Sequence, residues 1–195
     1  MKSWKVSFLS IFVAVLVVGL SSSASAAECV GVSVPNTVTV DGTELTLNGQ
    51  GLREATVFKV DVYVASLYVK SRSNNGQKLA TSNSPKRLVL SFVRDVDRSD
   101  VTDAYKESFK KTAGSKHSAL APKLNKLNSW MSAMEEGDTQ TYTYTPDDGL
   151  EVNINGKTKG TIEGKDFAEA FFSIWLGANP PNDGLKRGLL GGSCD

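Results

Sequence analysis

The sequence predicts an α+β fold in which helices lie on one face of a large antiparallel sheet. Strand patterns come first, two helical patterns follow, and further strands precede a last helix, an order typical of α+β proteins. The pairs Asp41-Gly42 and Asn155-Gly156 each lie between alternating segments, and they predict tight hairpins because type I′ turns need positive φ. Residues 166–176 form a helical pattern that is apolar around much of its circumference, so this helix is expected to be buried.

The strands are predicted from alternation of apolar and polar residues. A Gly-rich turn with Gly49 and Gly51 is expected before the longest strand, which starts at Val57 and has Phe58 on its apolar side. The apolar face of this strand changes near Ser66, which predicts a bulge or bend there. The other predicted strands are residues 37–40, 44–47, 87–93, 140–144, 150–154 and 158–162.

The helices are predicted from apolar residues that recur every three or four positions. The first begins at Asp97 or Ser99 and runs to about residue 112, before Gly114. The second is expected over residues 120–134, with Gly137 ending it. Residues 72–83 are predicted to be a loop with one helical turn, and residues 182–190 a short helix after the long helix at 166–176.

Residues 1–26 have the pattern of a signal peptide. Lys2 and Lys5 precede an apolar segment at residues 8–20, and Ala24-Ser25-Ala26 is typical of a cleavage site. Residues 27–195 are then expected to form a single domain, periplasmic or secreted, with no integral membrane segment after cleavage. Removal of the two lysines changes the formal charge of +1 by two units, to about −1, so no basic surface is expected that would bind nucleic acid.

Two cysteines, Cys29 and Cys194, lie near the two ends of the expected mature chain. In an oxidising compartment they can pair and close a very long loop, and the alternative is two unpaired thiols. The single histidine, His117, has no companions that would complete a His/Cys metal site, so neither a metal nor another cofactor is expected.

Arg53 is the strongest candidate for a functional side chain. Its guanidinium keeps its charge, so an arginine that faces inward needs an anion or several carbonyl groups as partners. The other interpretation is a surface arginine at the edge of a strand. Tyr63 lies opposite the valine stripe of the long strand, and its hydroxyl could share a ligand carboxylate with Arg53, or the ring could simply lie at the sheet margin.

Two stretches of the sequence resemble a known family. They are GLR at residues 51–53 with VFKVDVYVASLYV at 57–69, and the closing series NG at 155–156, IEG at 162–164, DFA at 166–168, IWLG at 174–177 and LLG at 189–191. Together they resemble the chalcone isomerase superfamily, in particular its bacterial chalcone-isomerase-like branch. The resemblance implies an open-faced β-sandwich of chalcone isomerase type, with a cleft between the sheet and the helices.

The resemblance also implies a role for Arg53. Plant isomerases of this superfamily use an arginine at this position to stabilise a developing enolate, whereas fatty-acid-binding relatives use it with a tyrosine at the position of Tyr63 to hold a carboxylate. The remaining isomerase residues would fall near Asp100, near Glu107 or Ser108, and near Ser173 or Ile174, and they are not reproduced.

The sequence therefore favours an exported, non-catalytic protein that binds a fatty acid or a similar small apolar carboxylate through Arg53 and Tyr63. One alternative is an intramolecular lyase, an isomerase that closes a ring by addition and uses Arg53 as a catalytic residue. Another is an interaction module whose cleft is filled and whose Arg53 pairs with Asp61 or a glutamate.

Overall fold

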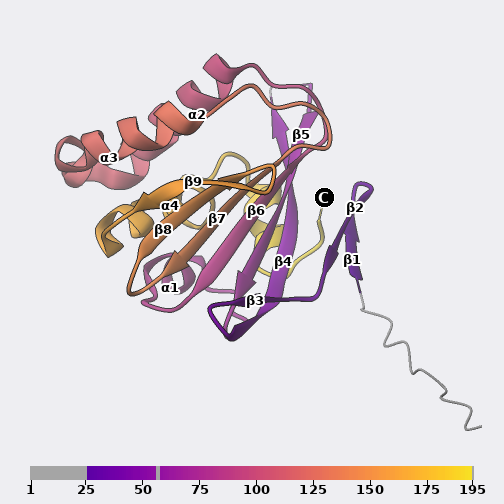
Figure 1. Ribbon diagram of the computed structural model, residues 1–195. Helices are drawn as coiled ribbons and strands as arrows, with labels where there is room; N and C mark the ends of the chain where they lie inside the picture. Colours follow the sequence, from indigo (N-terminus) through magenta and orange to yellow (C-terminus); the bar gives the residue numbers. More distant parts are fainter. Residues whose placement is uncertain (1–25, 56–57, 195) are drawn as a thin grey trace, which may run out of the picture.

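A computed structural model describes residues 26–55 and 58–194 (Figure 1). The predicted signal peptide falls almost entirely on residues 1–25, which lie outside the described residues. The main sheet is antiparallel throughout, and its strands follow one another in space in the order of the chain. It contains β3 (Thr37–Val40), β4 (Thr43–Ala55), β5 (Val60–Val69), β6 (Lys86–Phe92), β7 (Thr139–Thr145), β8 (Gly149–Ile154) and β9 (Lys157–Ile162).

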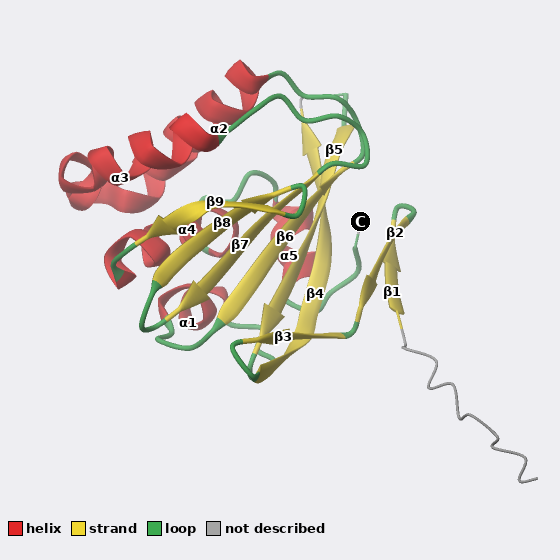
Figure 2. Ribbon diagram, in the orientation of Figure 1, coloured by secondary structure: helices red, strands yellow, loops and turns green. Residues whose placement is uncertain are grey.

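The helices lie on one face of this sheet, as the sequence predicts (Figure 2). They are α1 (Gly76–Thr81), α2 (Arg98–Ala113), α3 (His117–Trp130), α4 (Lys165–Leu176) and α5 (Asp183–Leu189), with a 3₁₀ turn η1 (Gly114–Lys116) between α2 and α3. Apolar side chains from all five helices share one buried core with the inward-facing residues of β5 to β9. The α+β class and the antiparallel sheet are therefore confirmed.

Both predicted hairpins are present. Asp41 and Gly42 have φ values of 46° and 74°, and Asn155 and Gly156 have 50° and 75°, which are the positive values that a type I′ turn needs. The chain reverses at these pairs to join β3 with β4 and β8 with β9.

The prediction for β4 and β5 was wrong in two places. Gly49 and Gly51 lie inside the long strand β4 and not in a turn. These positions need glycine because α5 lies directly on β4, and a Cβ at either one would collide with the backbone of α5 or of the residues just after it. The strand predicted to start at Val57 starts at Val60, and Phe58 lies before it with 84% of its surface exposed.

The bulge predicted near Ser66 is present beside this point, but its extra residue belongs to β4. Leu47 pairs with Tyr68 and Gly49 pairs with Leu67, so Asn48 is the additional residue, while the pairing of β5 with β6 is unbroken past Ser66. A second irregularity between β4 and β5 lies at Arg53/Glu54. Both faces of β5 are apolar because both are covered. Leu67 belongs to the core under the helices, whereas Tyr68 packs with residues of β3 and β4 on the opposite face.

Helix α2 begins after Asp97 and ends at Gly114 as predicted, but α3 differs from its prediction. It begins three residues earlier, at His117, and ends at Trp130, so Met131 and Met134 are not helical. Met134 instead forms an isolated bridge with Val96, with N–H to carbonyl distances of 2.8 and 2.9 Å in the two directions. The prediction was misled because both methionines are buried in the core at a spacing that a helix would also give. The helix ends at Trp130, however, and the backbone at Met131 is extended.

A small hairpin was not predicted. It consists of β1 (Ala26–Cys29) and β2 (Val32–Pro35), and it lies beside β4, on the opposite side of that strand from the helices (Figure 1). Cys29 at the end of β1 forms a disulfide with Cys194, so the pairing that the sequence left open is present. The carbonyl of Cys194 accepts a hydrogen bond from the Leu52 N–H at 3.0 Å, which covers part of the free edge of β4.

Candidate functional site

A cavity of about 800 Å³ lies between the sheet and the helices α2 and α4. This volume is in the upper part of the range of about 300–1,000 Å³ that is usual for small-molecule sites. Its walls are mainly apolar and include Val62, Leu90, Phe92, Val101, Ile174 and Trp175. An apolar cavity with a few polar groups is the form that binds an amphipathic small molecule.

Arg53 and Tyr63 meet at this cavity. They are directly paired residues of β4 and β5, so their side chains leave the same face of the sheet, and both line the cavity. Arg53 is half-buried, and its Nη1 donates a hydrogen bond to the carbonyl of Glu54. Within residues 26–55 and 58–194, no carboxylate forms an ion pair with its guanidinium.

The hydroxyl of Tyr63 is held in place by Trp175 of α4. The indole Nε1 donates a hydrogen bond to this hydroxyl at 3.0 Å, and the ring of Tyr63 packs against Phe92 with centroids 5.6 Å apart. Burial raises the pKa of Tyr63, although the hydrogen bond from Trp175 and the charge of Arg53 oppose the shift. Tyr63 is therefore a neutral phenol at ordinary pH, and its own hydrogen is available to an acceptor in the cavity.

A second group of polar side chains lies on the inner wall of the cavity. The Tyr105 hydroxyl of α2 is 2.7 Å from Oε1 of Gln140 on β7 and 2.5 Å from the hydroxyl of Tyr142, which itself donates to Oε1 of Gln140 at 2.9 Å. Tyr105 and Gln140 line the cavity. Burial is the main cause that raises the pKa of Tyr105 and of Tyr142, so both phenols stay protonated.

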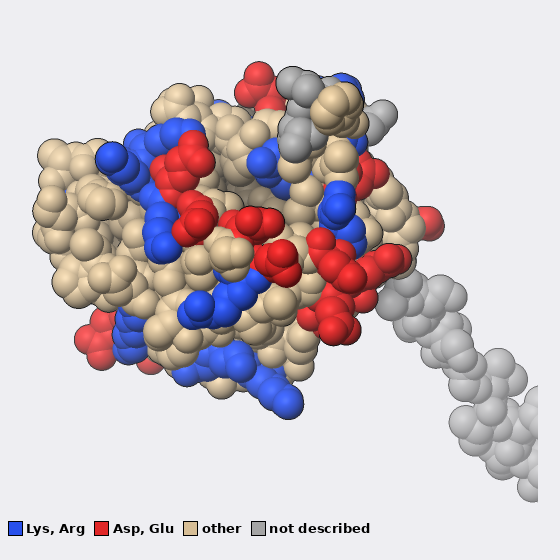
Figure 3. Space-filling model, turned by 90° about the horizontal axis from the view of Figure 1, so that it is seen from above, with Lys and Arg blue, Asp and Glu red and all other residues tan. Residues whose placement is uncertain are grey.

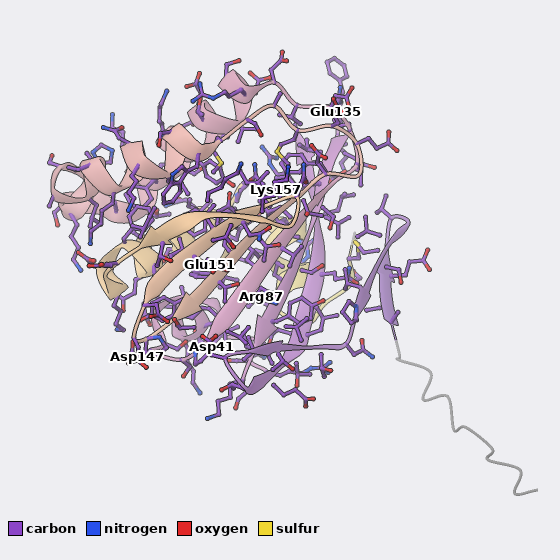
Figure 4. All side chains as sticks on the ribbon, viewed as in Figure 1. Asp41, Arg87, Glu135, Asp147, Glu151 and Lys157 are labelled. Carbon is purple, nitrogen blue, oxygen red and sulfur yellow. A yellow bond between two sulfur atoms is a disulfide. The ribbon has the colours of Figure 1, made fainter. Side chains whose placement is uncertain are left out.

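The rim of the cavity carries charges of both signs. Seen from above, acidic and basic side chains are interleaved on this side of the molecule (Figure 3), and Glu135 lies at the loop over the sheet (Figure 4). Carboxylates outnumber guanidinium groups among the residues that line the cavity, so the local field does not favour anions in general. Any attraction for an anion has to come from a specific contact with one of the two arginines, and of these Arg53 is half-buried whereas Arg94 is exposed. The charged lining residues are Arg53, Arg94, Asp95, Asp97, Asp100 and Glu135.

Residues 26–191 match the profile of the chalcone isomerase-like family. This chain belongs to the chalcone isomerase-like family. The resemblance seen in the sequence is thus confirmed, and it extends over nearly all of the described residues.

One solved structure similar to this chalcone isomerase-like chain is a fatty-acid binding protein of Arabidopsis thaliana. The two share 16% sequence identity with a TM-score of 0.64, and the alignment covers 82% of this chain and 92% of that chain. At this level of identity the similarity supports the fold, and the open-faced arrangement of sheet and helices is confirmed. Among curated proteins, none matches this chain significantly.

Only some of the positions where the resemblance places further isomerase residues line the cavity. Asp100, Ser108 and Ile174 line the cavity. Glu107 is exposed and pairs with Lys111 at 2.7 Å, and Ser173 donates a hydrogen bond to the Glu169 carbonyl. Among the residues described, no cluster of three or more His, Cys, Asp or Glu side chains is arranged to hold a metal ion, and no helix is long and apolar enough to cross a membrane.

Sequence reasoning missed three polar residues of the cavity, namely Tyr105, Gln140 and Trp175. Tyr105 and Trp175 belong to the apolar faces of their helices, so their periodicity indicated only core packing. Gln140 carried a usable signal, because it takes an inward position at the start of a strand whose next inward residues are Tyr142 and Tyr144. A buried amide needs hydrogen-bond partners, so such a residue points to a polar site within the core.

Proposed function

We propose that this protein binds a fatty acid or a similar small apolar carboxylate in the cavity, without chemical turnover. Arg53 anchors the carboxylate, Tyr63 donates a hydrogen bond to it, and the apolar walls take the hydrocarbon chain. The observation that carries this proposal is a half-buried guanidinium without a carboxylate partner among the described residues, directly paired with a neutral phenol at an apolar cavity. The fatty-acid binding relative of the same fold adds support.

The test is titration calorimetry with dodecanoate on the Arg53→Ala variant. Loss of a charged hydrogen-bond contact of about 2–4 kcal/mol lowers the affinity by an order of magnitude or more. Dodecanol, which has no carboxylate, serves as a second ligand whose affinity does not depend on Arg53. Thermal unfolding shows whether the variant remains folded.

Arg87→Ala is the matched control. It removes the same charge from β6, but Arg87 lies on the sheet face opposite the helices, where its Nε donates to Thr143 Oγ1 at 2.9 Å (Figure 4). We expect Arg87→Ala to leave the affinity for dodecanoate as in the wild type. Equal affinity in Arg53→Ala and the wild type would refute the role of Arg53.

The alternative is an intramolecular lyase, and the tyrosines that line the cavity with Arg53, namely Tyr63 and Tyr105, are the observation in its favour. An enzyme that closes a ring by addition needs a group that accepts a proton or holds a phenolate nucleophile. Burial raises the pKa of Tyr63, Tyr105 and Tyr142, so these phenols donate hydrogen bonds and are poor bases, which favours binding over catalysis. Turnover of a chalcone by the wild type that is lost in Arg53→Ala would establish the enzyme instead.

The third interpretation, an interaction module with a filled cleft, is disfavoured. The cavity has a volume of about 800 Å³, and among the described residues Arg53 does not pair with Asp61 or with a glutamate.

We further propose that residues 1–26 are a signal peptide and that residues 27–195 act as one exported domain in the periplasm or outside the cell. The disulfide between Cys29 and Cys194 supports this, since such bonds persist in oxidising compartments.

A further inference from the structure

The mouth of the cavity is bordered by the hairpin of β4 and β5. Ala55 and Val60, the last pair of this hairpin, line the cavity and are half-buried. The exposed residues of the cavity wall include Arg94, Asp95 and Glu135, and they mark the side on which the cavity opens. In Figure 1 the ends of β4 and β5 lie at the same end of the molecule as the loops that carry these three residues. The hairpin therefore continues from the cavity wall past the opening.

Phe58 follows this wall at the end of the hairpin and has 84% of its surface exposed. Within the described part of the chain, the other large apolar side chain that is exposed is Val30, with 48%, and it does not line the cavity. Single apolar side chains are common on protein surfaces. Phe58 differs from such a residue because it extends the apolar wall formed by Ala55 and Val60 into the solvent.

The size of this surface fits a lipid bilayer better than a protein partner. One aromatic side chain can bury about 150–250 Å², whereas a stable protein interface takes about 800 Å² from each partner. A bilayer needs no matching shape, and aromatic rings are favoured among its headgroups.

The charges near Phe58 indicate what kind of bilayer fits. Nζ of Lys59, whose side chain is 77% exposed, lies 3.8 Å from Oε1 of Glu54, so the end of the hairpin carries little net charge. Behind it, the cavity rim carries more carboxylates than guanidinium groups. This rim is repelled by an anionic surface, whereas zwitterionic headgroups do not repel it.

We propose that Phe58 inserts among the headgroups of a zwitterionic bilayer and that the ligand passes between the bilayer and the cavity during this contact. The inference rests on the proposed binding of a fatty acid, since the hydrocarbon chain of such a ligand is driven out of water into a membrane. Ala55 and Val60 give this chain an apolar path between the two. Insertion of one ring is a weak anchor, so the protein leaves the bilayer again after the exchange.

The test is stopped-flow transfer of ω-bromoundecanoate from the protein to phosphatidylcholine vesicles. Bromine quenches tryptophan fluorescence at short range, and Trp175 lines the cavity, so departure of the ligand restores the emission. Transfer by contact has a rate that rises with the vesicle concentration, whereas release into water does not. We expect Phe58→Ser to lower the slope of this rise about tenfold, because it removes the ring that inserts. The equilibrium affinity should stay as in the wild type, because Phe58 does not line the cavity.

Val30→Ser is the matched control. It removes the other exposed apolar side chain, which lies in the turn between β1 and β2 and away from the cavity, and transfer is expected to stay as in the wild type. Phe58→Leu keeps an apolar side chain and should retain most of the rate. Thermal unfolding shows whether each variant remains folded.

The outcomes separate this inference from the proposed function. A transfer rate that does not depend on the vesicle concentration, or an equal loss in Phe58→Ser and Val30→Ser, would overturn the contact through Phe58. An unchanged rate in Phe58→Ser would do the same and would leave this surface to a protein partner or a second copy. Faster transfer to vesicles that contain phosphatidylglycerol would contradict the choice of a zwitterionic bilayer.

In each of these cases, binding of dodecanoate that depends on Arg53 leaves the proposed function intact. If no fatty acid binds in a manner that depends on Arg53, the proposed function fails, and the exchange surface fails with it.

Discussion

The disulfide between Cys29 and Cys194 is expected to contribute much of the stability of this protein. The two residues are separated by 165 positions, and their Cα atoms lie 5.8 Å apart. Closing so long a loop removes a large share of the conformational freedom of the unfolded chain, and the chain-entropy estimate for this length is about 5 kcal/mol. Measured values are usually smaller, so we expect a loss of about 4 kcal/mol of unfolding free energy when both cysteines are replaced by alanine.

The position of the bond indicates which part of the molecule loosens first. Cys29 is buried with Leu52 and Val64, and Cys194 also packs on this cluster. The bond therefore holds both the β1–β2 hairpin and the C-terminal tail against β4. Without it, the hairpin should detach before the main sheet unfolds, since β1 and β2 pair only with each other within the described residues.

The assay is urea denaturation of the wild type, with and without reductant, and of the Cys29→Ala/Cys194→Ala variant. The reduced wild type and the variant should show the same lowered stability, and reductant should not affect the variant. Limited proteolysis should then cut near Val30-Gly31, the turn of the hairpin. A loss of less than about 1 kcal/mol would refute the entropic reasoning, and an unchanged proteolysis pattern would refute the proposed order of unfolding.

Two further predictions concern stability. Burial lowers the pKa of Lys86 from its ordinary value of 10.5 to about 8, so the unfolded chain binds this proton more tightly than the folded one. The contribution of Lys86 to the unfolding free energy therefore rises by up to about 3 kcal/mol between pH 8 and pH 10.5. We expect Lys86→Met to remove that rise, which urea denaturation at several pH values measures. The same dependence of stability on pH in both proteins would contradict the shift. Gly51→Ala places a Cβ against the backbone of Leu185 in α5 and is expected to cost about 3 kcal/mol or more, whereas Gly156→Ala, where nothing lies near, tests the effect of positive φ alone by the same method.

Much of the fold could be predicted from the sequence because its signals are local. Asp41-Gly42 and Asn155-Gly156 favour a particular turn through their own φ preferences, and α2 begins and ends at the residues that its pattern indicates. The prediction failed where distant segments decide the local structure. Gly49 and Gly51 look like turn residues until α5 lies on them, and Met131 looks helical until the segment that follows pairs with Val96.

The residues of the candidate site also divide into those that have a local signal in the sequence and those that have none. Arg53 and Tyr63 stand out in the sequence because a permanent charge and a phenol beside valines need partners, and they proved to be paired across β4 and β5. Tyr105 and Gln140 are 35 positions apart, and nothing in either local pattern indicates their contact.

The sequence by itself determined the order of the main strands and helices and the two tight hairpin turns, and it singled out Arg53 as the candidate anchor, since each of these depends on neighbours along the chain. Only the tertiary structure decided that Cys29 meets Cys194, that both faces of β5 are covered, and that the buried donors of Tyr105 and Gln140 line the same cavity as Arg53. The physical reason is that burial and hydrogen-bond satisfaction depend on which distant segments exclude water from a side chain. That information is absent from any single stretch of residues.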